Sequence, residues 1–238
     1  MGVALTLGIS TPPAARADGL DPEATRILQD MSNYLAQTPR FTVNADVDFE
    51  ILNRSGQLLQ FSSFQTLAVQ RPNQFRVTRQ GPVANAELIF DGTTLTLYGK
   101  NSNVYSQLAF ESRTGIPAPG GDFLFVDPYA ILSEGVNSST YMGTAYVNGI
   151  ECHHLAFRED DVDWQLWVQT GSTPLPMKYV IASKWVTSAP QYSVRLRDWN
   201  LNPQFTSGQF TFTPPVGAVK VEEVPASDVE DYLPPQGE

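Results

Sequence analysis

Cysteine is nearly absent from this 238-residue chain, since Cys152 is the only one. A single thiol excludes an internal disulfide framework and every zinc site built from several thiolates. Cations are also scarce: 15 Lys and Arg stand against 25 Asp and Glu, which gives a net charge of −10. Nucleic-acid binding normally depends on clustered cations that neutralise phosphates, so we expect no nucleic-acid partner. Long apolar runs are missing too, and no segment reaches the roughly 18 to 20 apolar residues of a membrane-spanning helix.

The N-terminus has the pattern of an export signal. An apolar run from Val3 to Ile9 is followed by Pro12-Pro13 and then by Ala15-Arg16-Ala17, an Ala-x-Ala pattern typical of signal-peptidase cleavage. We therefore expect residues 1–17 to be a signal peptide, although the basic residues that usually precede the apolar run are missing. The alternative is a plain N-terminal tail. The residue directly after the predicted cleavage site is Asp18 and not a cysteine, so the sequence predicts a soluble, exported periplasmic protein without a lipid anchor.

The composition favours a β-rich globular domain that begins with one helix. Hydrophobic residues make up 42% of the chain, enough for a core, and 13 Phe and nine Tyr are mixed with Thr, Gln and Ser. Asp21 can cap the helix, Pro22 suits its first turn, Glu23 complements its dipole, and Pro39 ends it. The apolar residues that recur at helical spacing are Ile27, Leu28, Met31, Tyr34 and Leu35.

From Phe41 onward the spacing at which apolar residues recur changes from the helical period of 3.6 residues to the strand period of 2. Apolar residues from Phe41 to Ile51 alternate with polar ones, as in an antiparallel strand with one buried face. Turn signals such as Asp91-Gly92 and Asn148-Gly149 separate further strand candidates. These candidates are residues 58–70, 74–79, 86–90, 94–98, 142–148, 151–158, 163–170, 176–186, 191–200 and 208–213. About eleven strands without a charged linker predict one large antiparallel sheet, strongly curved or nearly closed.

Three segments depart from this pattern of strands and turns. Residues 99–123 form a long connection rich in Gly, Pro and Asn that also carries apolar side chains, which suggests a lid. Asp127-Pro128 starts a short second helix, Tyr129 to Ser133, and Gly135 stops it. Residues 221–238 are acidic and Pro-rich, and we expect a loose tail from Glu222.

Three short segments, in this order, resemble motifs of a known family. They are Val69-Gln70-Arg71-Pro72-Asn73-Gln74-Phe75, then Leu88-Ile89-Phe90-Asp91-Gly92-Thr93-Thr94-Leu95 followed by Tyr98, and finally Phe210-Thr211-Phe212-Thr213-Pro214-Pro215-Val216-Gly217. The family is that of LolA, the periplasmic lipoprotein carrier. Residues 143–176 resemble the wider superfamily, which includes mycobacterial lipid-carrying lipoproteins and a bacterial group of predicted periplasmic proteins. The resemblance covers roughly residues 20–220, within a predicted domain of residues 18–220.

The resemblance implies a fold and a function. The fold is mainly β with few helices (α+β): a half-open antiparallel β-barrel closed by the N-terminal helix and the short second helix, around a cavity for acyl chains. It implies a monomeric periplasmic carrier or binding protein, without cofactor, whose partners are a lipid or acylated protein and a membrane-associated envelope component. Each inward side chain taken singly is explained better by a packed core, and only their combined number suggests a cavity. The candidate lining residues are Val43, Val47, Phe49, Phe64, Phe75, Phe90, Leu97, Trp164, Leu166 and Tyr179.

Arg71 occupies the position where, by the same resemblance, an arginine ties the barrel to its helical lid. Arginine suits this role because its planar fork can donate hydrogen bonds to several carbonyl oxygens at once. The alternative is an ordinary turn residue before Pro72.

The only cluster that resembles an active or metal site is Glu151-Cys152-His153-His154 with Asp160, Asp161 and Asp163 nearby. On a strand the two adjacent histidines point to opposite faces, so they do not readily share a metal ion. No Gly-x-Ser-x-Gly elbow, P-loop or dinucleotide fingerprint is present. We therefore predict that the protein is not an enzyme and holds no metal. The remaining alternatives are an envelope interaction module with a filled core and, less favoured, a hydrolase.

Overall fold

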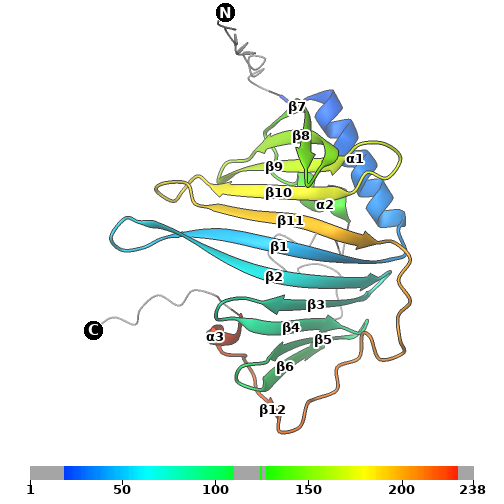
Figure 1. Ribbon diagram of the computed structural model, residues 1–238, viewed down its shortest axis with the longest axis vertical. Coiled ribbons are helices and arrows are strands. Elements are labelled where there is room, and N and C mark those ends of the chain that lie inside the picture. Colours follow the sequence, from blue (N-terminus) through cyan, green and yellow to red (C-terminus); the bar gives the residue numbers. More distant parts are fainter. Residues whose placement is uncertain (1–18, 110–123, 125–126, 230–238) are drawn as a thin grey trace, which may run out of the picture.

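The computed structural model describes residues 19–109, 124 and 127–229, which form one open sheet of twelve strands with three helices (Figure 1). The strand order is β12-β6-β5-β4-β3-β2-β1-β11-β10-β9-β8-β7, and all neighbours are antiparallel except β12 and β6. In chain order the elements are α1 (Pro22–Gln37), β1 (Arg40–Leu52), β2 (Leu58–Gln70), β3 (Gln74–Gln80), β4 (Asn85–Phe90), β5 (Thr94–Gly99), β6 (Val104–Ala109), α2 (Pro128–Ser133), β7 (Ser138–Val147), β8 (Ile150–Arg158), β9 (Val162–Gln169), β10 (Pro176–Ser183), β11 (Gln191–Asn200), β12 (Val219–Lys220) and α3 (Ala226–Val229). The predicted fold class, mainly β with an open antiparallel barrel and helices, is confirmed.

The alternation in β1 defines the two faces of the sheet. Phe41, Val43, Ala45 and Val47 are buried, whereas the residues between them are only partly so. We call the face that carries Val43 and Val47 the inner face and the opposite one the outer face. The period of two fixes this assignment along every strand that is paired in register with β1.

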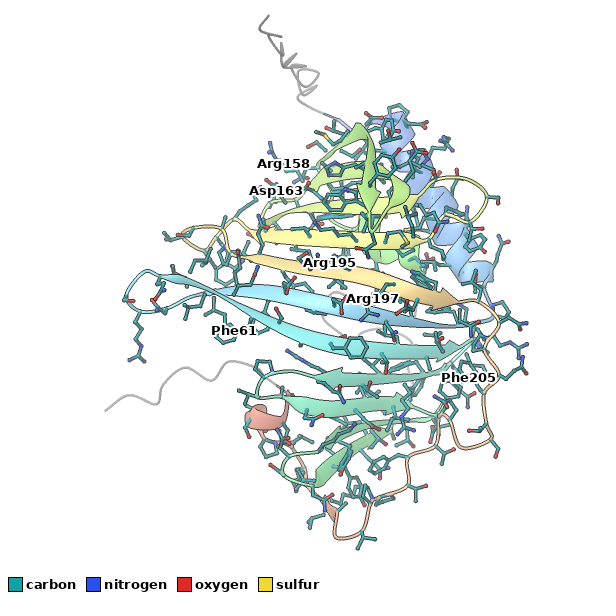
Figure 2. All side chains as sticks on the ribbon, viewed as in Figure 1. Phe61, Arg158, Asp163, Arg195, Arg197 and Phe205 are labelled. Carbon is teal, nitrogen blue, oxygen red and sulfur yellow. The ribbon has the colours of Figure 1, made fainter. Side chains whose placement is uncertain are left out.

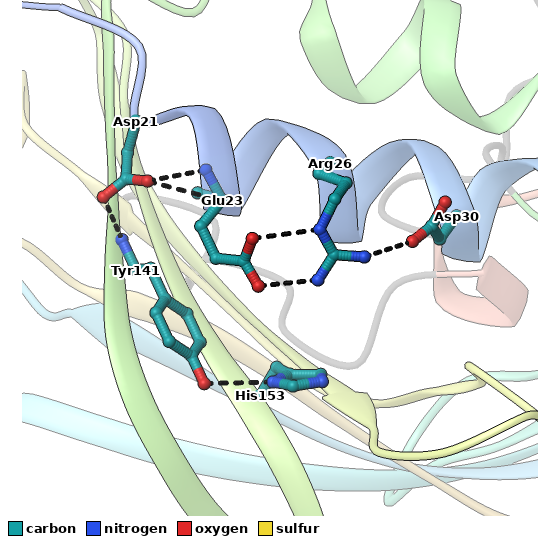
Figure 3. A network of polar contacts seen from close by, with 7 residues as sticks. Asp21, Glu23, Arg26, Asp30, Tyr141 and His153 are labelled. Carbon is teal, nitrogen blue, oxygen red and sulfur yellow. Dashed lines mark hydrogen bonds and ion pairs between the residues drawn. The ribbon is translucent and has the colours of Figure 1, made fainter.

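Helix α1 packs on the inner face beside β7 and β8. Its predicted stripe is real, because Ile27, Leu28, Met31 and Leu35 are all buried. The Asp21 side chain caps the helix by accepting the backbone N–H of Glu23 at 2.8 Å and of Ala24 at 3.3 Å. Its other carboxylate oxygen accepts the N–H of Tyr141 in β7 at 3.1 Å (Figure 3). One residue therefore starts the helix and fixes it to the edge of the sheet.

The chain after β11 forms a strap, residues 201–229, that runs from the middle of the sheet to its far edge (Figure 1). On the outer face, Phe212 contacts Tyr98 and Tyr105, with ring centroids 5.5 and 5.0 Å apart. Arg76 donates to the carbonyl oxygen of Gln209 at 3.3 Å. Beneath this part of the strap, Arg76 and Lys100 both pair with the largely buried carboxylate of Glu87.

The strap then passes along β6, where it forms the edge strand β12, and ends on the inner face. Strand β12 pairs with β6, and α3 lies beside β4. Asp228 of α3 is fully buried and accepts hydrogen bonds from the backbone N–H and the hydroxyl of Ser102, at 3.0 and 2.6 Å. The approach is close: a Cβ on Gly99 would lie 2.7 Å from the Asp228 side chain.

Several sequence predictions need correction or fall outside the described residues. The strand predicted at residues 208–213 is wrong, because this segment crosses the outer face as part of the strap. The loose tail predicted from Glu222 is wrong as far as residue 229, because α3 is anchored by Asp228. The connection of residues 99–123 contains the strand β6, and its residues 110–123 lie outside the described part. The predicted signal peptide and residues 230–238 lie outside it as well. Within the described residues, no helix has the length and apolarity needed to cross a bilayer.

Candidate functional site

An apolar row crosses the inner face from the middle of the sheet toward its β6 edge. The strand registers place Val43, Leu67, Val77, Leu88 and Leu97 opposite one another on five successive strands. Val43 and Leu67 are buried, whereas Val77, Leu88 and Leu97 are only half-buried. Leu108 on β6, one row away, is 62% exposed. The half of the inner face built from β2 to β6 therefore presents aliphatic side chains that the rest of the described chain covers incompletely.

Helices α1 and α2 cover the other half, where β7 to β11 lie. α1 packs on α2, β7 and β8, and Tyr129, Ile131 and Leu132 of α2 pack against the same core. Three predicted lining residues on this half, Trp164, Leu166 and Tyr179, belong to that core. One core thus extends under both halves of the inner face, and on the half built from β2 to β6 Val77, Leu88 and Leu97 stay partly exposed.

Nine of the ten predicted lining residues lie on the inner face and one does not. Phe64 lies on the outer face, opposite Asp46 and next to the Arg197 guanidinium, which is 5.4 Å from its ring centroid. Phe64 is out of phase with Ser63 and Leu67, buried inner-face residues of β2, and residue type alone does not reveal this. Of the other nine, Phe49 and Leu97 are half-buried. The remaining seven are at least 93% buried: Val43, Val47, Phe75, Phe90, Trp164, Leu166 and Tyr179.

An aromatic pair lies at the end of the inner face near the β1–β2 hairpin. Phe49 stacks on Phe61 of β2 with ring centroids 5.6 Å apart, and Ile51 lies opposite Leu59. Figure 2 labels Phe61. All four side chains are half-buried. We call this end the mouth. Sequence reasoning missed Phe61 and Leu59, although the alternation of β2 read backwards from Leu67 would have placed both on the inner face.

Arg71 lies in the β2–β3 turn, at the end of the sheet opposite the mouth. Its Nε donates to the carbonyl oxygen of Leu35 in α1 at 3.1 Å, and its Nη2 donates to the carbonyl oxygen of Leu124 at 3.0 Å. Its backbone N–H also donates to the carbonyl oxygen of Pro39 at 2.8 Å. Burial lowers the pKa of Arg71 from its ordinary value, yet arginine stays charged at neutral pH. The Arg71 side chain thus connects the β2–β3 turn to α1 and to the segment before α2. We call α1 and α2, which lie over the inner face, the helical cover.

The His and Cys cluster on β8 is divided between the two faces. His153 Nδ1 lies 3.1 Å from the Tyr141 hydroxyl, in the network that includes the start of α1 (Figure 3). His154 instead stacks on Trp167, with ring centroids 4.2 Å apart. Burial raises the pKa of the Cys152 thiol to about 11. Among the described residues no group of three or more His, Cys, Asp or Glu side chains is placed to hold a metal ion.

Comparison with known proteins identifies a family and a fold. A family model described as "Predicted periplasmic protein (DUF2092)" matches residues 24–223. An uncharacterized conserved protein of Thermus thermophilus superposes with a TM-score of 0.53, at 12% identity, over 84% of this chain and 98% of its own. LprF of Mycobacterium bovis superposes with a TM-score of 0.52, at 15% identity, over 79% of this chain and 98% of its own.

A third solved structure carries the superfamily name. The LolA superfamily protein NE2245 of Nitrosomonas europaea matches 79% of this chain and 97% of its own, with a TM-score of 0.38 and 12% identity. None of the curated proteins matches the chain. At these low identities, the likenesses to the Thermus thermophilus protein and to LprF show a shared fold and nothing more.

Proposed function

Because the chain belongs to the DUF2092 family of predicted periplasmic proteins, we propose that it is a periplasmic binding protein that carries an acyl chain of a lipid or lipoprotein. The observation that supports this is the partly exposed row of Val77, Leu88 and Leu97 on the inner face. Burying a methylene group contributes about 0.8 kcal/mol, so part of a long acyl chain laid on this row gains several kcal/mol. The role needs no catalytic group.

Two phenylalanines on β2 provide a matched test. Phe61 is half-buried on the inner face at the mouth, and Phe64 is half-buried on the outer face. We expect Phe61→Ser to weaken binding of a fluorescent fatty acid by about tenfold or more, because a large apolar contact is lost. Phe64→Ser should leave the affinity within about twofold of wild type. Equal effects of the two substitutions would contradict binding on the inner face.

A filled core is the second candidate, and the seven buried lining residues favour it. In this interpretation the protein is an interaction module that holds no ligand. Val47, which is 2% exposed, distinguishes the two interpretations. In a filled core, Val47→Trp should overpack the site and cost about 1 to 3 kcal/mol of stability. An interior with room for a ligand should accept the indole with a nearly unchanged melting temperature, and fatty-acid binding should then be lost.

A further inference from the structure

Exposed apolar side chains gather at the mouth end of the sheet. Because neighbouring strands run in opposite directions, the β1–β2, β3–β4, β5–β6, β8–β9 and β10–β11 connections all lie at this end. Nine large apolar side chains are exposed among the described residues, and six of them lie in these connections or beside them. The six are Leu20, Leu58, Val83, Trp185, Val216 and Val219. Exposed apolar residues scattered singly are ordinary, whereas a group at one end of a molecule indicates an interaction surface.

Trp185, in the β10–β11 loop, is the largest of these side chains and is 75% exposed. The backbone of this loop is fixed on both sides. The N–H of Lys184 donates to the carbonyl oxygen of Asp161 in the β8–β9 connection at 2.9 Å. The N–H of Gln191 donates to the Glu50 carboxylate on β1 at 2.9 Å. A loop held by both of its neighbours therefore presents an indole to solvent.

The exposed indole is continuous with the apolar end of the inner face. The strand registers place Ile181, Tyr192, Phe49 and Phe61 opposite one another on four successive strands, and all four side chains are partly exposed. This row lies between the β10–β11 loop and the β1–β2 hairpin, which project on the same side of the sheet (Figure 1). An acyl chain that passes from a bilayer directly onto the row avoids the unfavourable exposure of its methylene groups to water.

The charges at the mouth end do not favour an anionic partner. The β8–β9 connection carries three acidic residues, Glu159, Asp160 and Asp161. The nearby cation of Lys184 lies 3.5 Å from the Asp163 carboxylate and also donates to the carbonyl oxygen of Glu159 at 2.6 Å. A surface with this charge attaches by apolar contact, and tryptophan is the side chain most suited to the boundary between lipid and water, because its ring is apolar and its N–H is polar.

From these observations we infer that the mouth end docks on the surface of a phospholipid bilayer with zwitterionic head groups, and that Trp185 is its anchor. The inference rests on the proposed function, and it adds the place where an acyl chain enters or leaves the inner face. Membrane binding of this kind increases with the apolar area buried. A single indole buries little area, so the attachment is reversible, as a carrier that leaves the membrane requires.

The test measures binding of the full chain to phosphatidylcholine vesicles by co-sedimentation and by tryptophan fluorescence. Wild-type protein should bind, with an emission shift to shorter wavelength. Trp185→Ser should weaken binding about tenfold and remove the shift, because a large apolar side chain no longer enters the bilayer. The control is Tyr146→Ser, which changes a 72% exposed aromatic residue of β7 near the opposite end of the sheet and should leave vesicle binding unchanged. Vesicles of equal parts phosphatidylcholine and phosphatidylglycerol should bind wild type more weakly.

A fluorescent fatty acid separates docking from the proposed function. In solution without vesicles, Trp185→Ser should bind the fatty acid within about twofold of wild type, whereas its uptake of the fatty acid from vesicles should be slower. Wild type that ignores phosphatidylcholine vesicles, or equal losses in Trp185→Ser and Tyr146→Ser, would overturn the docking surface and leave acyl binding intact. Tighter binding to the phosphatidylglycerol mixture that salt reverses would also overturn it, because the attachment would then be electrostatic. Wild type that binds no fatty acid in solution would instead refute the proposed function.

Discussion

Replacing Arg71 with leucine should detach the helical cover from the sheet. The substitution keeps an apolar stem but removes the donors to the carbonyl oxygens of Leu35 and Leu124. A hydrogen bond from a charged donor contributes about 1.5 to 3 kcal/mol. The Leu35 oxygen also accepts the N–H of Thr38 at 3.2 Å, so its loss is partly compensated. We expect a destabilisation of about 2 to 4 kcal/mol, which lowers the melting temperature of a domain this size by about 5 to 15 °C.

Hydrogen exchange followed by mass spectrometry locates the effect. Exchange should accelerate in α1 and α2, while the central strands β1 and β11 remain protected. Arg158→Leu is the control, because its side chain is 66% exposed and its ion pair with Asp163 lies at the surface, where such pairs contribute at most about 1 kcal/mol (Figure 2). Uniformly faster exchange throughout the sheet, or unchanged exchange in α1, would refute the assignment of Arg71 as a latch.

Gly99→Val should expel α3, because its Cβ would meet the buried Asp228; limited proteolysis should then cut the strap after β12, and an intact strap would contradict the packing. Burial opposes ionisation of Glu87, but its two cationic partners, Arg76 and Lys100, hold its pKa below the ordinary value. The Glu87 carboxylate therefore contributes fully to stability above about pH 4.5, and this contribution is lost as the pH falls through the lower folded pKa. Glu87→Gln should flatten the melting temperature against pH in that acidic window, and an unaltered profile would contradict this. Cys152 should resist alkylation at pH 8 in the native protein and react after denaturation, because its raised pKa and burial suppress the thiolate; rapid native labelling would oppose this.

Local sequence signals predicted much of the fold. The Asp21 cap and the apolar stripe define α1, and strict alternation defines β1 and its buried face. Both signals act within a few residues, so they can be recognised without knowledge of the tertiary structure. The motif that contains Arg71 placed this residue at the turn where it binds the cover, although sequence alone does not identify Leu35 and Leu124 as its partners.

Long-range packing explains what the sequence did not predict. Phe210 and Phe212 alternate as in a strand, but tertiary contacts with Tyr98 and Tyr105 hold this segment across the outer face instead. The tail looked loose because its composition is acidic and Pro-rich, yet one buried carboxylate, Asp228, anchors it through Ser102. Such contacts join residues more than a hundred positions apart and leave no local periodicity.

Native mass spectrometry of the protein, released from its native envelope without detergent, tests acyl binding most directly. We expect an additional mass that survives gentle ionisation, is lost on denaturation and is identified as an acyl-containing molecule. Phe61→Ser should carry less of this mass, and Phe64→Ser should carry the wild-type amount. A bare polypeptide mass in every preparation, together with no uptake of a fluorescent fatty acid, would contradict the proposal that the inner face carries acyl chains.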